Sequence, residues 1–411
     1  MMRTIGLDVG RHWATVAIKE PGAPVRAADR IAVSPEGLRR FAATLGPDDQ
    51  VVLEASTNTW AIAGLLAAHA GRVVVSNPLR TRAIADAKTK TDQIDAAVLA
   101  ELLAADYIPE VWQPDERTRE LRALVAKRAA LVRSRTAQRN RVAAVLARAL
   151  LAPPVADTFS VAGRAWLATL ALPAHESLAR GTALRRHDAI ETEVAAVEQA
   201  IAVAVADDRG VRHLLTVPGL GATTCACLVA VIGDVTRFPR PGRLVSYLGL
   251  DPRVRQSGAR SFTGHISRAG QAHARSLLIE AAHAAVRTPG PLRAFHDRVR
   301  RRRGSGVAIV AVARKLAVLA WHLLTKDTDY LWSPATLTAD KVRRLELLAG
   351  APRRFELRGT FRDARAERSR ARSIERAALE TAEQAYRELV GSRTRPRARL
   401  AADAAAAAGS D

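Results

Sequence analysis

The sequence contains few cysteines and fewer acidic than basic residues. Among 411 residues only Cys225 and Cys227 are cysteines, a C-x-C pair without a second cluster. This excludes a disulfide scaffold and a cysteine zinc site, and it indicates a reducing compartment. Asp and Glu number 41 against 63 Lys and Arg, so the formal net charge is +22. An excess of this size makes polyanions the expected partners, nucleic acid first among them.

Long uninterrupted apolar runs are also missing. The first ten residues, MMRTIGLDVG, lack the apolar segment and small-residue cleavage site of a secretory signal. The most apolar later stretch, Val307 to Leu324, is interrupted by Arg314 and Lys315, and we do not expect it to span a bilayer. The sequence therefore predicts a cytoplasmic protein with no membrane partner.

Four regions follow one another along the chain. Residues 1–110 alternate predicted strands and helices, which is typical of an α/β domain. In residues 111–210 apolar side chains recur at spacings near 3.5, which predicts a coiled coil of two long antiparallel helices. Residues 211–330 form a second, mostly helical domain. Residues 331–411 form a basic extension that we expect to be partly disordered or ordered only on a partner.

The predicted coiled coil carries arginines at its outward positions: Arg128, Arg133, Arg135, Arg139 and Arg141. A solvated face, serving as a dimer contact or a spacer, accounts for them. The basic excess of the whole chain adds contact with nucleic acid as a second interpretation.

Four carboxylates of the first region stand where structural elements begin or end. Asp8 ends the first predicted strand, Glu54 ends a later one, and Asp92 and Asp95 share one face of a predicted helix. Taken singly, each is explained by a turn or by the dipole of a helix. Together they would meet at one edge of the sheet and repel one another, so we expect a bound divalent cation. Carboxylate oxygens suit Mg²⁺ or Mn²⁺.

A glycine-rich turn precedes an apolar helix in the third region. Residues 217–221 read Val-Pro-Gly-Leu-Gly, and the pattern has the form of a helix-hairpin-helix turn. Gly219 and Gly221 would let the backbone approach a phosphate. A structural loop with a helix cap explains the same residues equally well.

Ser257 stands next to Gly258 in a segment rich in arginine. The neighbouring basic residues are Arg253, Arg255, Arg260, Arg268 and Arg275. Their guanidinium groups could hold phosphate oxygens while the hydroxyl attacks a phosphodiester. A Ser-Gly pair by itself is more often a turn, and Ser267 is an alternative nucleophile.

These residues belong to a series of motifs in a fixed order. They are Gly6-Leu7-Asp8, Glu54-Ala55-Ser56, Lys90-Thr91-Asp92-Gln93-Ile94-Asp95-Ala96, Val217-Pro218-Gly219-Leu220-Gly221, Tyr247-Leu248-Gly249-Leu250-x-Pro252, Gln256-Ser257-Gly258 and Ile266-Ser267-Arg268-x-Gly270. The series resembles the DEDD transposases of bacterial insertion sequences, which are related to the Piv and MooV DNA invertases. The resemblance covers residues 3–326. Arg268 departs from the pattern, where lysine is more usual.

The resemblance implies a ribonuclease-H-like (RuvC-like) N-terminal domain, a coiled coil and a transposase domain. It implies that Asp8, Glu54, Asp92 and Asp95 bind Mg²⁺, for which Mn²⁺ can substitute, and that Ser257 joins covalently to DNA. The implied partners are double-stranded DNA of the element ends and target, and further copies of the chain in a dimer or tetramer. Some family members use an element-encoded bridge RNA. The implied location is the bacterial cytoplasm, at the nucleoid.

Two other functions fit the same residues. In a metal-dependent nuclease or Holliday-junction resolvase, water attacks the phosphate and Ser257 is only a turn residue. In a non-catalytic nucleic-acid-binding protein, the basic surface acts alone and the carboxylates have no part.

Overall fold

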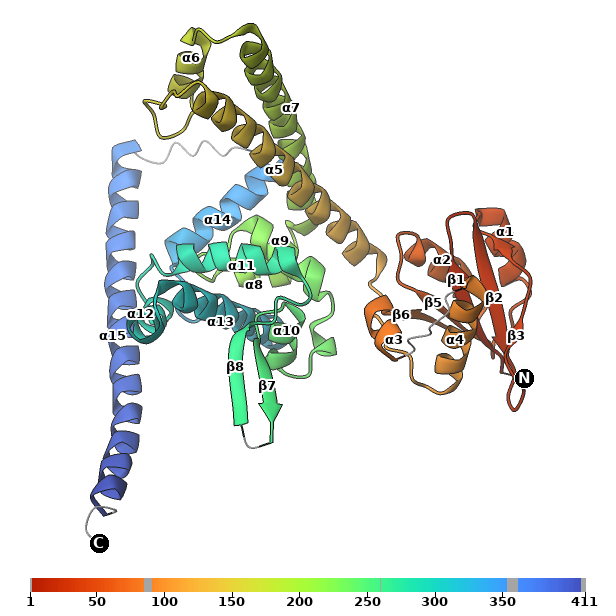
Figure 1. Ribbon diagram of the computed structural model, residues 1–411. Coiled ribbons are helices and arrows are strands. Elements are labelled where there is room, and N and C mark those ends of the chain that lie inside the picture. Colours follow the sequence, from red (N-terminus) through yellow and green to blue (C-terminus); the bar gives the residue numbers. More distant parts are fainter. Residues whose placement is uncertain (1, 85–90, 259, 353–360, 408–411) are drawn as a thin grey trace. The chain divides into compact units, whose positions relative to one another are not determined.

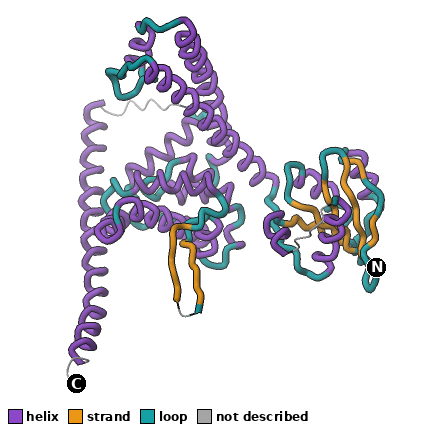
Figure 2. Tube along the Cα trace, in the orientation of Figure 1, coloured by secondary structure: helices purple, strands orange, loops and turns teal. Residues whose placement is uncertain are grey.

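The computed structural model describes residues 2–84, 91–258, 260–352 and 361–407. The chain divides into two compact units, Met1–Asp115 and Glu116–Asp411. The first combines a sheet with helices, and the second is mostly helical with one β-hairpin (Figures 1 and 2). The prediction of an α/β region followed by helical regions is therefore confirmed.

Unit 1 is built on a mixed sheet with the strand order β3-β2-β1-β5-β6, in which β4 also pairs with β2. The strands are β1 (Thr4–Val9), β2 (Trp13–Lys19), β3 (Arg26–Ala27), β4 (Ile31–Ala32), β5 (Gln50–Glu54) and β6 (Arg72–Ser76). β1 and β2 form an antiparallel hairpin, whereas β5 and β6 run parallel to β1. Residues 26–32 contribute two short strands, β3 and β4, which both pair with β2.

The described residues of unit 1 form four helices, α1 (Pro35–Ala42), α2 (Thr59–Leu66), α3 (Pro78–Ile84) and α4 (Asp92–Ala104). Of these, α1, α2 and α4 pack against strands of the sheet. Two of them begin at a capping side chain. Ser34 Oγ accepts a hydrogen bond from Gly37 N at 3.1 Å, and Thr91 Oγ1 accepts one from Ile94 N at 3.3 Å. Each cap satisfies a backbone N–H that the first turn of a helix leaves without a partner.

Gly6 allows α4 to lie directly on the sheet. A Cβ at residue 6 would stand 2.0 Å from Ala96 O and 2.8 Å from Ala100 N. Ala96 and Ala100 are fully buried at this contact, and Leu99 packs on Val52 of the neighbouring strand. The small residues of α4 thus set how closely its acidic first turn approaches β1.

We expect Gly6→Ala to destabilise unit 1 by about 1–3 kcal/mol, because the added methyl group overpacks a contact between two backbones. Gly64→Ala is the matched control, since a Cβ there meets no atom within 4 Å. That substitution should be neutral or stabilise α2 by up to about 1 kcal/mol. Urea unfolding of both variants measures the difference, and equal effects would contradict the close contact.

Unit 2 begins with two long helices joined by a short one: α5 (Glu116–Arg148), α6 (Val161–Thr169) and α7 (Ala174–Val205). α5 and α7 pack against each other along their length (Figure 1). Ion pairs fix an antiparallel register, with Arg128 2.6 Å from Glu198 and Arg148 2.6 Å from Glu176. The apolar stripes predicted from the sequence therefore pair within one chain.

Most of the arginines expected on an outward face of this helix pair bond to other side chains of unit 2. The pairs are Arg128–Glu198, Arg135–Glu191, Arg139–Asp157 and Arg141–Gln138. These partners within the chain agree with a structural role for the arginines, and their contact with nucleic acid stays a prediction.

A helical core follows α7. Its helices are α8 (Arg209–Leu215), α9 (Ala222–Ile232), α10 (Pro241–Tyr247), α11 (Ala272–Ala285), α12 (Pro291–Arg303) and α13 (Ser305–Lys326). Among the described residues, α13 is the one helix whose length and composition would allow it to cross a bilayer. Because Arg314 and Lys315 interrupt its apolar run, we did not expect it to do so. Its buried residues, such as Val312 and Leu316, pack in the core formed with α8, α10 and α11, as in the core helix of a globular unit.

Residues 252–266 form a β-hairpin, β7 (Pro252–Ser257) and β8 (Arg260–Ile266), for which no strands were predicted. Ser257 and Gly258 stand at its tip.

The described residues of the basic extension contain α14 (Ala335–Leu348) and α15 (Phe361–Ala407). α15 contacts α12 and α14, and its residues Leu379 and Ala382 are buried. The partial disorder expected of the extension stays a prediction.

Lys341 of α14 joins this extension to the turn after α8. Its Nζ donates hydrogen bonds of 2.8 Å to both Leu215 O and Val217 O. Burial lowers the pKa of Lys341 from its ordinary value of 10.5 to about 8. Because the folded state releases this proton more easily than the unfolded state, the folded state gains stability as the pH rises between these two values.

We therefore expect Lys341→Met to remove a pH dependence of stability. From pH 8 to pH 9 the wild type should gain about 1 kcal/mol relative to the variant. Higher pH is avoided because Cys225, Cys227 and Tyr330 are buried and each has its pKa raised to about 12. These groups lose their protons more easily in the unfolded state, so a further rise in pH lowers the stability of both proteins. Urea unfolding at the two pH values measures it, and parallel behaviour of the two proteins would contradict the assignment.

Candidate functional site

Two of the four predicted metal ligands, Asp8 and Glu54, belong to neighbouring strands of the sheet in unit 1, on the face that α4 covers. Side chains alternate between the two faces of a strand. Asp8 is two residues after Gly6, which contacts α4, and Glu54 is two residues after Val52, which also packs on α4. β1 and β5 are parallel with Leu7 opposite Leu53, so Asp8 and Glu54 follow at neighbouring strand ends.

Asp92 and Asp95 lie in the first turn of α4, at the same end of the sheet. Arg30 shows this. It follows β3 and lies beside the part of β2 that contains Thr15, which pairs with Asp8 in the hairpin. Its Nη2 is also 3.5 Å from Asp92 Oδ2, so Asp92 lies near the same end of the sheet. Asp92 is exposed, while the other three carboxylates are half-buried. Within the described ranges, no three His, Cys, Asp or Glu side chains are close enough to hold a metal ion.

The structure thus brings the carboxylates to one region without closing a ligand cage. Four carboxylates are the oxygen donors that Mg²⁺ and Mn²⁺ prefer, so the donor set fits such an ion. The ion pair with Arg30 offsets part of the repulsion at Asp92. Lys90 of the same motif lies outside the described residues.

In unit 2 the hairpin β7–β8 places Ser257 and several basic residues on one face. Arg255 pairs with Phe262 and Ser257 with Arg260 across the two strands. Directly opposed residues of an antiparallel pair project to the same side, and so do residues two apart on one strand. Arg255, Ser257, Arg260 and Phe262 therefore share a face, and Val254 and Thr263 share the other.

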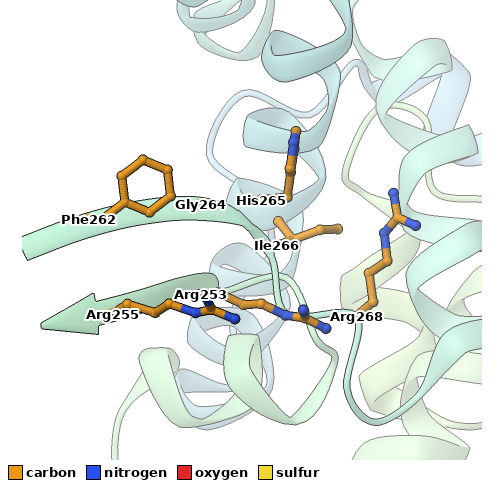
Figure 3. Close-up of a pocket in the computed structure, with 7 residues that line it drawn as sticks. All are labelled: Arg253, Arg255, Phe262, Gly264, His265, Ile266 and Arg268. Carbon is orange, nitrogen blue, oxygen red and sulfur yellow. The ribbon is translucent and has the colours of Figure 1, made fainter.

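A pocket of about 360 Å³ opens at the base of this face (Figure 3). Arg253 and Arg255 from β7, Phe262 and His265 from β8, and Arg268 from the following loop line it. The described part of the chain places no carboxylate in this lining. The pocket can therefore receive an anion such as a phosphate.

The two candidate nucleophiles have different surroundings. Ser257 is exposed at the tip of the hairpin, and its Oγ has no hydrogen-bond partner among the described residues. Ser267 is half-buried, and its Oγ donates to Asp251 Oδ1 at 2.7 Å, while Ser246 Oγ donates to Asp251 Oδ2 at 3.1 Å. Ser267 is thus engaged in fixing the base of the hairpin, whereas the Ser257 hydroxyl is accessible to a substrate.

The base of the hairpin is held by two reciprocal backbone contacts. A Cβ at Gly249 would be 2.1 Å from Ala269 O, and a Cβ at Gly270 would be 2.2 Å from Tyr247 O. Both glycines have positive φ, +68° and +86°, a region that other residues rarely adopt. The motif around Tyr247 and the motif around Arg268 therefore interlock, which fixes where β7 starts and β8 ends.

Other predicted nucleic-acid contacts are placed differently. Gly219 lies against α11, where a Cβ would be 2.3 Å from Ala281 O, whereas a Cβ at Gly221 would meet no atom within 4 Å. Arg275 donates from Nη1 to Leu248 O at 3.1 Å and is half-buried. Gly219 and Arg275 thus serve packing inside unit 2, and Gly221 at the start of α9 remains open.

Sequence reasoning missed Phe262 and His265 as members of this surface. Phe262 is 69% exposed, which is unusual for an aromatic side chain of its size. An exposed ring on a basic strand can stack on a nucleic-acid base. The signal was present in the alternation of β8, but it becomes visible only once the strand pairing is known.

The buried thiols are excluded from the chemistry. Burial raises the pKa of Cys225 and of Cys227 to about 12, so neither is a thiolate at neutral pH. Neither cysteine is therefore a candidate nucleophile.

Comparisons with known proteins assign the chain to a family. Residues 5–150 match a family model for the DEDD domain of IS110, described as a transposase. Residues 211–297 match the model of the transposase IS116/IS110/IS902 family. The first match contains Asp8, Glu54, Asp92 and Asp95, and the second contains Ser257.

Relatives cover most of the chain. It is 30% identical to a probable family 20 transposase of Pseudomonas aeruginosa over 59% of this chain and 74% of that protein. It is 27% identical to the transposase for insertion sequence element IS1328 of Yersinia enterocolitica, over 79% of this chain and 98% of the relative. The pilin gene-inverting protein of Moraxella lacunata is 27% identical over 68% and 81% of the two chains. The chain therefore belongs to the IS116/IS110/IS902 family of transposases and is an enzyme that cuts and rejoins DNA.

Proposed function

We propose that the chain is an insertion-sequence transposase in which Ser257 attacks a DNA phosphodiester. The bond from Oγ to phosphorus forms, the bond from phosphorus to a deoxyribose oxygen breaks, and that oxygen leaves with a proton as Ser257 loses its own. The covalent phosphoserine keeps the bond energy, so a second DNA hydroxyl can displace Ser257 and reseal the strand without ATP.

The observation that carries this proposal is the shared face of the hairpin. Ser257 projects to the same side as Arg255 and Arg260. Two guanidinium groups beside the nucleophile can orient a phosphate and offset the negative charge that develops on its oxygens. Since the hydroxyl is exposed, a DNA backbone can reach it without a change in the core.

The carboxylates of unit 1 supply the second part of the proposal. Asp8, Glu54, Asp92 and Asp95 would hold Mg²⁺, with Mn²⁺ as a substitute. When bound, such an ion polarises a phosphate oxygen and stabilises the charge of the attacking and leaving groups. The hairpin of β1 and β2 followed by parallel β5 and β6 supports a ribonuclease-H-like fold for this unit.

Partners follow from the same proposal. Double-stranded DNA of the element ends and target is the substrate. The family resemblance adds a bridge RNA encoded by the element as a guide. Strand exchange holds several DNA ends together, so we propose a dimer or tetramer working on DNA in the cytoplasm. Because α5 and α7 pair within one chain, such assembly would use other faces than the stripe between these helices.

Hydrolysis is the second candidate reaction. The exposed Ser257 has no hydrogen-bonded base on the hairpin among the described residues, an arrangement that a nuclease with an attacking water would share. The two reactions differ in whether a covalent intermediate exists.

We expect wild-type protein and a labelled duplex carrying the element ends to give a DNA adduct that survives denaturation. Ser257→Ala should abolish the adduct, because the attacking oxygen is removed. Thr263→Val removes a hydroxyl from the opposite face of the same hairpin and should preserve it. Cleavage without any adduct would favour hydrolysis, and an adduct that disappears only in Ser267→Ala would move the nucleophile there.

Asp92→Asn should reduce strand cleavage by about 100-fold or more, as expected when one charged group of a preorganised site is lost. DNA binding in EDTA should stay close to that of the wild type. Glu101→Gln makes the same charge change at an exposed position of the same helix and should leave cleavage unchanged. Equal cleavage by both variants over a Mg²⁺ titration would argue against a metal site at α4.

A further inference from the structure

A second basic pocket lies between α12 and the C-terminal helix α15, away from the hairpin. Its volume is about 270 Å³. Arg298, Arg301 and Arg302 of α12 line one side, and Tyr386, Arg387 and Gly391 of α15 line the other. Figure 1 shows α15 passing alongside α12. The family model ends at residue 297, so nearly all of this lining lies beyond the matched region.

Glu383 fixes how α15 sits on α12. Its side chain is 4% exposed, and its Oε2 accepts hydrogen bonds from Gly290 N at 2.9 Å and Arg293 Nε at 2.8 Å. Leu379 and Ala382 are buried in the same contact. Since removing one partner of a buried ion pair is strongly unfavourable, this lock holds Tyr386 and Arg387 opposite the arginines of α12.

The positive charge of the pocket is not balanced within the described part of the chain. Only Arg387 has carboxylate partners there, Glu383 at 2.5 Å and Asp297 at 3.7 Å. No ion pair is formed by Arg298, Arg301 or Arg302 with the described residues. The Nε of Arg298 is buried and has no hydrogen-bond partner among them. A buried N–H group without a hydrogen-bond acceptor lowers the stability of the protein, and a ligand that accepts a hydrogen bond from it removes this cost.

The dipole of α12 explains only part of this arrangement. Arginines in the last turn of a helix are stabilised by the negative end of its dipole. This stabilisation applies equally to Arg300 and Arg303, which do not line the pocket. It does not explain why three arginines at positions 298, 301 and 302 face a tyrosine and a fourth arginine on another helix.

We propose that the pocket between α12 and α15 binds a phosphate group of a nucleic-acid backbone. Planar guanidinium groups match phosphate oxygens with paired hydrogen bonds, and the Tyr386 hydroxyl adds a further donor. At Gly391 a Cβ would meet no atom within 4 Å, so the rim is open and a polynucleotide can enter and leave. The extension thus adds a nucleic-acid contact to the one proposed at the hairpin.

The test compares two double variants that each remove two charges from the end of α12. Fluorescence anisotropy with labelled DNA and RNA duplexes of equal length, in EDTA and from 50 to 300 mM salt, measures binding alone. Arg298→Gln/Arg302→Gln should lower the affinity for at least one duplex and reduce its salt slope by about one for each phosphate that the pocket no longer binds. Arg300→Gln/Arg303→Gln should leave the slope near that of the wild type. Equal effects of both double variants would overturn the proposal.

Two further experiments distinguish binding in the pocket from an effect on folding and from binding of a small phosphate compound. Gly391→Phe fills the rim without changing charge and should weaken duplex binding, whereas Gly391→Ala should not. Inorganic pyrophosphate, tested directly by calorimetry, distinguishes the source of the phosphate. If only pyrophosphate binding depends on Arg298 and Arg302, the site serves a free phosphate compound and the proposal is wrong. Because the assay needs neither metal nor Ser257, failure of the proposed mechanism would not affect it.

Discussion

Contacts between backbones, too close for any side chain, hold both candidate sites of this protein. Gly6 brings α4 and its two aspartates onto the sheet, and Gly249 and Gly270 interlock the two motifs that carry the hairpin. Because such contacts leave no room for a side chain, they fix how closely the two backbones approach. The acidic and the basic site are both built on this constraint, although their chemistry is opposite.

The net positive charge is divided between structure and surface. On α5 and α7, arginines such as Arg128 and Arg148 are paired with glutamates and set the helix register. On the hairpin, Arg255 and Arg260 flank Ser257, and on α12 the arginines near Arg298 lack carboxylate partners in the described chain. Net charge alone therefore indicates a polyanionic partner, whereas the pattern of ion pairs indicates which arginines remain available to it.

Much of the fold could be predicted from local patterns. Ser34 and Thr91 begin helices because their side chains cap the first turn, and the spacing of apolar residues revealed α5 and α7. The hairpin was missed because it depends on the pairing of its two strands, such as Arg255 with Phe262, which a local pattern does not encode. The carboxylates could be located on one edge from strand order, but their mutual distances depend on how α4 packs, which no single residue encodes.

Under the proposed function, the hairpin separates chemistry from stability. The middle and tip of β7, from Arg253 to Ser257, are exposed, whereas the base of the hairpin packs against the helical core of unit 2 through Ile266. Substitutions near Ser257 would then need little repacking elsewhere. On this proposal, the tip of the ribbon is free to acquire new contacts with DNA in the course of evolution while the helical core keeps the protein folded.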